Sequence, residues 1–230
     1  MGQAKNITLF TGIILMILGI FALVSIFSKS ANPVVVQDSA KLAKNISALS
    51  SEQLKRIDND LAFSIGPKNA KVVVVEFLDF KCDFCKESAV TLRRLMAIYK
   101  NTSVRFVIRH LPLSDVHPFA MEASRAALCA REQNKFLEMH YALFSHQEKL
   151  TSLLFPQLAK NLGLDVVAFN RCYAENKYEN LILKDISDAG DIGVTGTPTF
   201  FINGNMIQGS IPGVVLEKII NSFEDEEQSL

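Results

Sequence analysis

The sequence lacks an excess of charge of either sign, and it has few cysteines. Its 24 Lys and Arg residues balance 24 Asp and Glu residues, so the formal net charge at pH 7 is zero. This balance argues against a basic nucleic-acid-binding protein. Four cysteines in 230 residues are too few for a small disulfide-rich scaffold, although the even number leaves two pairs possible. The length fits one domain with an appendage better than two full domains.

One segment lacks charge altogether, because the 23 residues from Asn6 to Ser28 carry no charged side chain. As a helix this run spans about 34 Å, enough to cross a hydrocarbon core of about 30 Å. The apolar part of a signal peptide usually has only about 7 to 15 residues. Residues 1–30 are therefore predicted to form a cytoplasmic tip and an uncleaved, single-pass anchor in the inner (cell) membrane. The small residues around Ala31 leave cleavage and a periplasmic location as the alternative.

Residues 31–67 carry apolar side chains at positions that are too sparse for a core. They are predicted to form a stalk or linker that is partly helical, with a small oligomerisation element as the alternative. Gly66-Pro67 interrupts the chain before the first strong strand pattern. The main domain is therefore predicted over residues 68–226.

The main domain begins with an α/β pattern. Lys71 to Leu78 is a continuous run of apolar and mainly β-branched residues, typical of a central strand that is covered on both faces. Cys85 to Tyr99 shows the apolar spacing of a helix, and Val104 to Arg109 resembles a second strand. Strand, helix and strand in this order predict two parallel strands joined by a right-handed crossover.

A helical block separates this unit from the last strands. No strand pattern occurs from about residue 117 to 190, where apolar and small residues follow helical spacing. Strand patterns return at 199–202 and 206–208 on either side of Asn203-Gly204, which is a strong hairpin signal. A final helix is expected at about 214–223.

The motif Cys82-Asp83-Phe84-Cys85 lies where the first strand ends and the first helix begins. Residues i and i+3 of a helical turn share a face about 5 Å apart, within the ~4.4 to 6.8 Å that a disulfide allows between Cα atoms. The positive end of the helix dipole favours a thiolate at Cys82. Cys82 is therefore predicted to be the nucleophile, and Cys85, one turn further in, the resolving thiol.

A lone Cys-x-x-Cys motif is a weak signal, because half of a structural zinc site looks the same. Structural zinc needs four ligands. Cys129 and Cys172 are 43 positions apart, and the four histidines provide no second closely spaced pair. A redox pair is favoured over a metal site, and an inert structural pair remains the third interpretation.

These residues resemble a known family, the thioredoxin-fold proteins, and among them the DsbA-like thiol:disulfide oxidoreductases of the bacterial envelope. The resemblance covers about Gly66 to Phe223. It rests on the ordered combination of the apolar strand 72–77, the site 80–86, an insertion with His117-Pro118, and the segment 193–204. It implies an α/β, thioredoxin-like fold with an all-helical insertion at about 117–190, which here follows the predicted N-terminal transmembrane helix. No metal or organic cofactor is expected.

The resemblance also implies roles for Glu76, Thr197 and Pro198. Glu76 lies where the fold places a buried acid beneath the active site, and such a carboxyl has a raised pKa and can relay the proton of Cys85. An exposed Glu at a strand end is the alternative. Thr197-Pro198 matches the family's cis-proline loop, in which the residue before Pro pairs with the substrate backbone. A trans Pro that simply opens the strand is the alternative here.

The chain departs from the family between the two cysteines, where DsbA-type oxidases commonly have a His. Asp83 adds a negative charge beside Cys82, while Lys81 and Lys86 oppose it. An exposed charge pair is worth only about 1 kcal/mol, or roughly 20 mV for a two-electron couple. Asp83 therefore favours a weaker oxidant but does not decide the direction of electron flow.

Cys129 and Cys172 both lie in predicted helices of the insertion, and neither has a partner close in sequence. In an oxidising compartment a structural disulfide between them is favoured over two buried free thiols.

The sequence thus predicts a DsbA-like protein disulfide oxidoreductase that acts as an oxidase and faces the periplasm or the extracellular side. Its expected partners are unfolded or partly folded Cys-containing proteins, a membrane redox partner that resets the Cys pair, and the membrane itself, with no nucleic acid. A disulfide isomerase or reductase is the alternative within the same class. A copper(I)- or zinc-binding protein that uses Cys82 and Cys85 as soft ligands is the alternative from another class.

Overall fold

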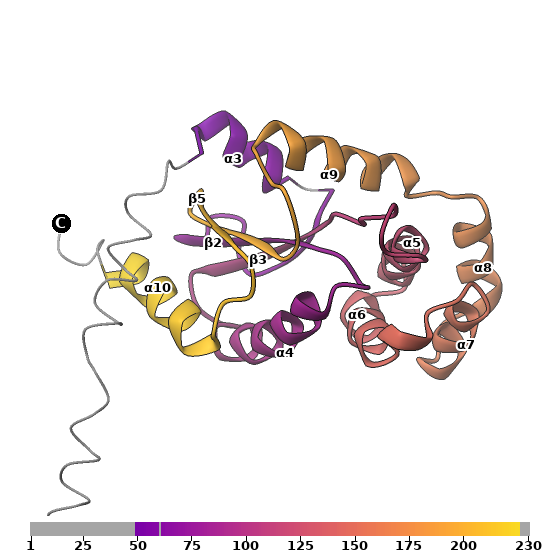
Figure 1. Ribbon diagram of the computed structural model, residues 1–230. Helices are drawn as coiled ribbons and strands as arrows, with labels where there is room; N and C mark the ends of the chain where they lie inside the picture. Colours follow the sequence, from indigo (N-terminus) through magenta and orange to yellow (C-terminus); the bar gives the residue numbers. More distant parts are fainter. Residues whose placement is uncertain (1–48, 60, 226–230) are drawn as a thin grey trace, which may run out of the picture. The chain divides into compact units, whose positions relative to one another are not determined.

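A computed structural model describes residues 49–59 and 61–225 of the chain. The predicted anchor and the predicted stalk up to residue 48 lie outside the described residues. In the described part, no helix combines the length and the apolar character that crossing a bilayer requires. The elements follow one another along the chain (Figure 1) as α3 (Ser51–Ile57), β1 (Phe63–Ile65), β2 (Val72–Leu78), α4 (Asp83–Ile98), β3 (Val104–His110), α5 (Ala120–Arg131), α6 (Phe136–Ser145), the 3-10 helix η1 (Gln147–Lys149), α7 (Leu154–Asn161), α8 (Val166–Ala174), α9 (Glu179–Asp191), β4 (Thr199–Ile202), β5 (Asn205–Gln208) and α10 (Gly213–Asp225).

The strands form one mixed sheet in the order β1-β3-β2-β4-β5. β2 and β3 are parallel, with Val74 opposite Phe106, and α4 connects them, which confirms the predicted strand–helix–strand unit. β4 is antiparallel to β2 and forms the expected hairpin with β5. Asn203 and Gly204 make this turn with φ values of 46° and 83°, as a tight hairpin requires.

Helices cover both faces of the sheet (Figure 1). α4 and α10 pack on one face, and α9 and α3 lie on the other. Side chains alternate along β2, so that Val74 and Leu78 enter the core with α4, while Val75 and Phe77 enter a second core on the opposite face. Burial of each large apolar side chain contributes roughly 1.5–3 kcal/mol. The same alternation turns Glu76 toward the α4 face, beneath the cysteine motif.

The segment between β3 and β4 is helical from α5 to α9, which confirms the predicted insertion. α5 lies at its centre, and the side chains of Ala123, Ala126, Ala127 and Ala130 on this helix are completely buried. Because a methyl group takes little room, neighbouring helices can pack closely around α5. The insertion therefore has its own core beside the sheet, and its helices α6 and η1 reach the cysteine motif.

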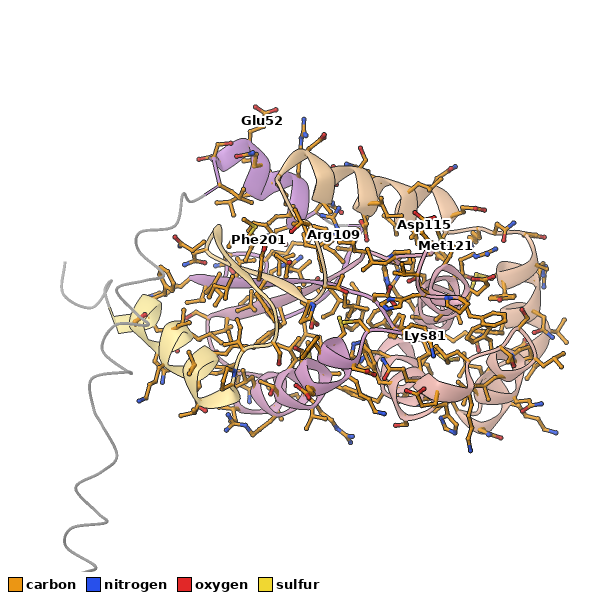
Figure 2. All side chains as sticks on the ribbon, viewed as in Figure 1. Glu52, Lys81, Arg109, Asp115, Met121 and Phe201 are labelled. Carbon is orange, nitrogen blue, oxygen red and sulfur yellow. A yellow bond between two sulfur atoms is a disulfide. The ribbon has the colours of Figure 1, made fainter. Side chains whose placement is uncertain are left out.

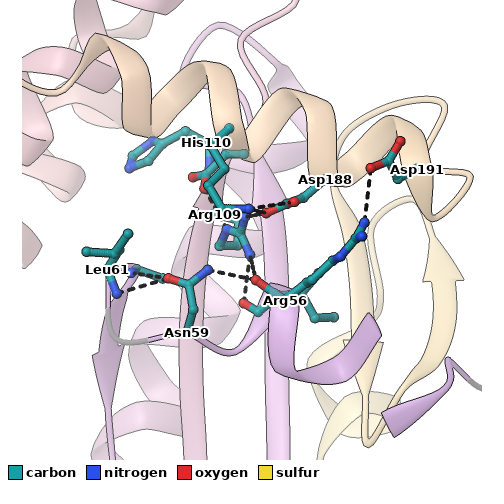
Figure 3. Close-up of polar contacts among 11 residues, drawn as sticks. Arg56, Asn59, Leu61, Arg109, His110, Asp188 and Asp191 are labelled. Atoms are coloured by element: carbon teal, nitrogen blue, oxygen red, sulfur yellow. Dashed lines mark hydrogen bonds and ion pairs between the residues drawn. The ribbon is translucent and has the colours of Figure 1, made fainter. Parts of the chain in front are cut away.

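A buried ion cluster ties α3, β3 and α9 together (Figure 3). Arg109 is fully buried on β3, and its guanidinium donates to Asp185 at 2.7 Å and to Asp188 at 2.6 Å on α9. It also donates to the backbone carbonyl oxygens of Arg56 and Ile57, at 2.9 Å each. A buried charge is tolerated when its donors are paired in this way.

The second half of the predicted stalk packs on the domain. Ile57 of α3 is completely buried, and β1 extends the sheet beside β3. The N–H of Leu49 donates to the carbonyl oxygen of Gly204 at 2.9 Å. The packed unit therefore includes residues well before 68. The sequence pattern suggested a linker because these short elements bury few apolar side chains.

Candidate active site

The two cysteines of the Cys-x-x-Cys motif lie at the N-terminus of α4, directly after β2. Cys82 caps the helix with an extended backbone conformation, and Cys85 lies in the first turn. Both are free thiols. Cys82 exposes 7% of its surface, whereas Cys85 exposes none. The pair is therefore asymmetric, with one sulfur near solvent and the other behind it.

A loop from a distant part of the sequence lies against Cys82. The peptide bond between Thr197 and Pro198 is cis. The Cys82 thiol donates to the backbone carbonyl oxygen of Thr197 at 3.3 Å. Thr199, which follows this loop, begins β4 and pairs with Phe77 of β2. The pairing of β2 with β4 thus brings together the motif and the loop that the sequence placed at the site.

Hydrogen bonds lower the pKa of Cys82 from 9.0 to about 6. The largest cause is the hydrogen bond from the Cys85 thiol; burial opposes the shift, while the Thr197 side chain and the backbone N–H groups of Cys85 and Phe84 add to it. At pH 7 Cys82 is then mainly thiolate, the form that attacks disulfides. Burial, followed by the hydrogen bond to Cys82, raises the pKa of Cys85 well above 9.0. The two thiols therefore differ in charge as well as in exposure.

Glu76 lies on β2 beneath the two sulfurs. Its side chain is 1% exposed, and neither carboxyl oxygen has a hydrogen-bond partner among the described residues. Burial, and after it the charge of Cys82, raises the pKa of Glu76 from 4.5 to about 8. The carboxyl is therefore protonated at pH 7. When it is ionised, its negative charge raises the pKa of Cys85. This position fits a group that exchanges a proton with the Cys85 thiol.

Asp79 is a site residue that the sequence prediction missed. Its fully buried carboxylate accepts hydrogen bonds from the backbone N–H groups of Lys81 at 2.6 Å and Leu113 at 2.8 Å, and it contacts Nδ1 of His117 at 2.8 Å. The N–H of Asp79 donates to Sγ of Cys85 at 3.4 Å. Asp79 thus fixes the loop before the motif and the position of the buried sulfur. The available signal was an acidic residue directly after a buried strand.

Gln147 of η1 was also missed. Its buried side chain donates from Nε2 to the carbonyl oxygen of Cys82 at 2.8 Å. The carbonyl oxygen of Gln147 accepts a hydrogen bond from Nζ of Lys81 at 3.0 Å, and Figure 2 labels Lys81 near this junction with the insertion. The helical insertion is therefore bonded directly to the motif. No local pattern could reveal a contact across 65 sequence positions.

Cys129 and Cys172 form a disulfide between α5 and α8, with their Cα atoms 5.8 Å apart. They expose only 1% and 4% of their surfaces. The structure thus joins the two cysteines that the sequence suggested as a structural pair, and it keeps them apart from Cys82 and Cys85.

Asp83 and Phe84, between the two free cysteines, are exposed. In the part of the chain that the structure describes, no group of three or more His, Cys, Asp and Glu side chains is placed to hold a metal ion. His110 and His140 are buried instead, with ring centroids 6.0 Å and 5.5 Å from that of Phe80. Burial lowers the pKa of both histidines to about 3, so they are neutral near pH 7.

Known proteins resemble this chain at the level of sequence. A family model described as thioredoxin matches residues 58–222. The chain is 42% identical over 153 residues to Na(+)/H(+) antiporter NhaA 3 of Salinispora tropica. The matched segment covers 66% of this chain and 23% of that protein. The chain is 40% identical over 154 residues to Na(+)/H(+) antiporter NhaA 1 of Salinispora arenicola, with 67% and 23% covered. The chain thus spans about a quarter of the length of these curated relatives.

Solved structures resemble the chain over most of its length. The thiol-disulfide exchange protein alpha-DsbA2 from Wolbachia pipientis has a TM-score of 0.68 at 23% identity, covering 84% of this chain and 99% of that one. The catalytic domain of Proteus mirabilis ScsC has a TM-score of 0.65 at 22% identity, covering 75% and 95%. At these identities the likeness concerns the fold. The chain therefore belongs to the thioredoxin family, and its fold is that of the DsbA-like thiol-disulfide oxidoreductases.

Proposed function

We propose that this chain oxidises dithiols in extracytoplasmic proteins. The observation that carries the proposal is the asymmetry of the thiol pair. Cys82 keeps 7% of its surface exposed and has a pKa of about 6, whereas Cys85 exposes none and has a pKa well above 9.0. A thiol of low pKa is a good leaving group, and a stable thiolate favours the reduced form of the pair. Both properties suit an oxidant.

The reaction starts from a disulfide between Cys82 and Cys85. A substrate thiolate attacks Sγ of Cys82, a mixed disulfide forms, and the bond to Cys85 breaks. The departing Cys85 thiolate takes the proton of Glu76, which regains one from solvent. A second substrate thiolate then attacks the substrate sulfur of the mixed disulfide and releases Cys82 as a thiolate. Two electrons pass from the substrate dithiol to the pair, and a disulfide-bearing membrane partner takes them up by the same exchange.

The loop at Thr197 supports this reaction by its position. The carbonyl oxygen of Thr197 lies 3.3 Å from Sγ of Cys82. An extended substrate segment that pairs with the backbone of this loop would bring its own sulfur next to Cys82. Thr197 and Pro198 are therefore proposed as substrate-binding residues.

The proposed place of action is outside the cytoplasm. The disulfide between Cys129 and Cys172 supports this location, because structural disulfides persist in oxidising compartments. The charge-free run from Asn6 to Ser28 supports attachment to the inner (cell) membrane. Unfolded or partly folded Cys-containing proteins are the proposed substrates.

Oxidation of a fluorescent dithiol peptide by the preoxidised protein tests the proposal. Cys82→Ser removes the attacked sulfur and should abolish oxidation. Cys85→Ser is the matched control, since it keeps Cys82 and should accumulate a mixed disulfide, visible by mass spectrometry, when it is offered a peptide disulfide. Peptide oxidation by Cys82→Ser at the wild-type rate would refute the proposed chemistry.

The redox potential of the pair tests the direction of electron flow. An oxidase should equilibrate near the value of DsbA, about −120 mV, and a reductase near that of thioredoxin, about −270 mV. Equilibration of the wild-type pair with glutathione buffers, read by alkylation of free thiols, gives the potential. A value near that of thioredoxin would contradict the oxidase direction and leave the exchange chemistry intact.

A further inference from the structure

A groove lies between residues of α4 and residues of α6, two helices that Figure 1 shows as neighbours. The volume of the groove is about 180 Å³. Ala89 and Phe144 are buried in its floor, and Val90 is 72% exposed at its edge. The guanidinium of Arg93 lies 4.8 Å from the centroid of the Tyr141 ring. The residues that line the groove are Lys86, Ala89, Val90, Arg93, Tyr141, Phe144 and Ser145.

The groove suits one side chain of a polypeptide better than a cofactor. Its volume lies below the roughly 300–1,000 Å³ of ordinary small-molecule sites. Lys86 and Arg93 are the charged residues of its lining, and both are cationic. Apolar atoms between two positive charges complement an apolar side chain that has an acidic neighbour.

The groove continues the helix face on which Cys82 lies. Lys86, Ala89 and Arg93 follow Cys82 at spacings of four, seven and eleven, which place all four residues on one stripe of α4. At 1.5 Å per residue, Val90 at the edge of the groove lies about 12 Å along the helix axis from Cys82. An extended peptide covers that distance in about four residues.

We propose that this groove binds the polypeptide substrate about four residues away from its reacting cysteine, and that it selects an apolar residue next to an acidic one. This inference rests on the proposed function and names the substrate class of that site. The substrate is joined to Cys82 during the reaction, so a segment at this distance is held within reach of the groove. Lys86 and Arg93 then pair with the acidic side chain, while Ala89 and Phe144 contact the apolar one.

Matched dithiol peptides test the inference on the wild-type chain. One peptide carries Leu-Glu four residues from a cysteine, a second carries Leu-Lys, and a third carries Ser-Ser there; each is made with the pair on either side of the cysteine. In at least one of the two arrangements, kcat/KM for the Leu-Glu peptide should exceed that for the Leu-Lys peptide by about three- to tenfold. This is the effect expected when an attractive, exposed charge pair is replaced by a repulsive one. The Ser-Ser peptide lacks both side chains that the groove is proposed to bind, so its kcat/KM measures the exchange reaction alone.

Arg93→Glu should reverse the order of the two charged peptides. Lys100→Glu is the matched control, because it makes the same change in net charge at an exposed position beyond the end of α4, and it should keep the wild-type order. The ratio of two peptides on one variant does not depend on how much of that variant is folded. A ratio that Arg93→Glu leaves unchanged, or equal rates for all peptides on the wild-type chain, overturns the inference.

The other outcomes separate the groove from the proposed function. Exchange of the Ser-Ser peptide at the same rate as the Leu-Glu peptide keeps the proposed function and overturns the groove. No exchange with any peptide overturns the proposed function together with the inference that rests on it. A concentration-dependent dimer that Arg93→Glu dissociates assigns the groove to a second copy of the chain and overturns the substrate role.

Discussion

Glu76→Gln tests whether a protonated carboxyl lies beneath the thiol pair. The pKa of Glu76 is about 8 in the folded chain, against an ordinary value of 4.5. Between pH 4.5 and about 8, Glu76 is therefore protonated in the folded chain but ionised in the unfolded chain. Stability that is fully present below pH 4.5 is lost as the pH rises to about 8. By pH 7 the loss amounts to about 3 kcal/mol, because each pH unit in this window contributes about 1.36 kcal/mol.

Gln has nearly the size of the protonated carboxyl but cannot ionise. The free energy of unfolding of Glu76→Gln should therefore be about 3 kcal/mol higher than that of the wild type at pH 7. The difference should shrink toward zero as the pH falls to 4.5. Urea denaturation across this range measures the difference. Glu87→Gln, at an exposed position of α4, is the matched control and should change stability by less than about 0.5 kcal/mol at every pH. A difference between Glu76→Gln and wild type that stays constant with pH would refute the reasoning.

The same variant separates proton transfer from thiolate formation. Cys82 titrates near pH 6, where Glu76 is still protonated. The pH midpoint of Cys82 alkylation should therefore stay near 6 in Glu76→Gln. The step in which Cys85 gains or loses its proton should slow by about 10²-fold or more, the usual contribution of a general acid or base.

Two further substitutions test the surroundings of the site. Asp79→Asn should lower the free energy of unfolding by about 1–3 kcal/mol, because it leaves a partly buried N–H of Lys81 or Leu113 without its acceptor. It should also speed the alkylation of Cys85, and unchanged stability and reactivity would contradict the role given to Asp79. Cys129→Ala opens a disulfide whose cysteines are 43 positions apart, which should lower stability by about 2–4 kcal/mol and leave peptide oxidation unchanged. Urea denaturation and the peptide assay measure both, and a large loss of activity in folded Cys129→Ala would contradict a purely structural disulfide.

Sequence patterns predicted those elements whose contacts repeat over short distances. The first strand was expected at 71–78 and forms as β2 at Val72–Leu78, and the second was expected at 104–109 and forms as β3 at Val104–His110. β1 escaped prediction because three residues carry no usable period. α3 was expected only as part of a stalk, because its packing depends on buried contacts such as those of Arg109, which the fold alone brings together.

The candidate site divides in the same way. The place of Cys82 at a strand–helix junction is local, so the sequence could single it out as the nucleophile. The low pKa of Cys82 depends partly on Thr197, 115 positions away. Asp79 and Gln147 have ordinary sequence neighbours, and they belong to the site because of partners on other elements. Such long-range hydrogen bonds leave no spacing that a sequence pattern could detect.

The chain carries a reactive thiolate and a disulfide in one molecule, so it needs a barrier against its own chemistry. A thiolate exchanges with any disulfide sulfur that it can reach. Cys129 and Cys172 expose 1% and 4% of their surfaces inside the insertion. Cys172 lines a surface pocket of about 320 Å³, whereas Cys129 is buried behind it. A thiol in solution therefore has little of either cysteine to approach while α5 and α8 stay packed, and local opening of these helices should speed the exchange.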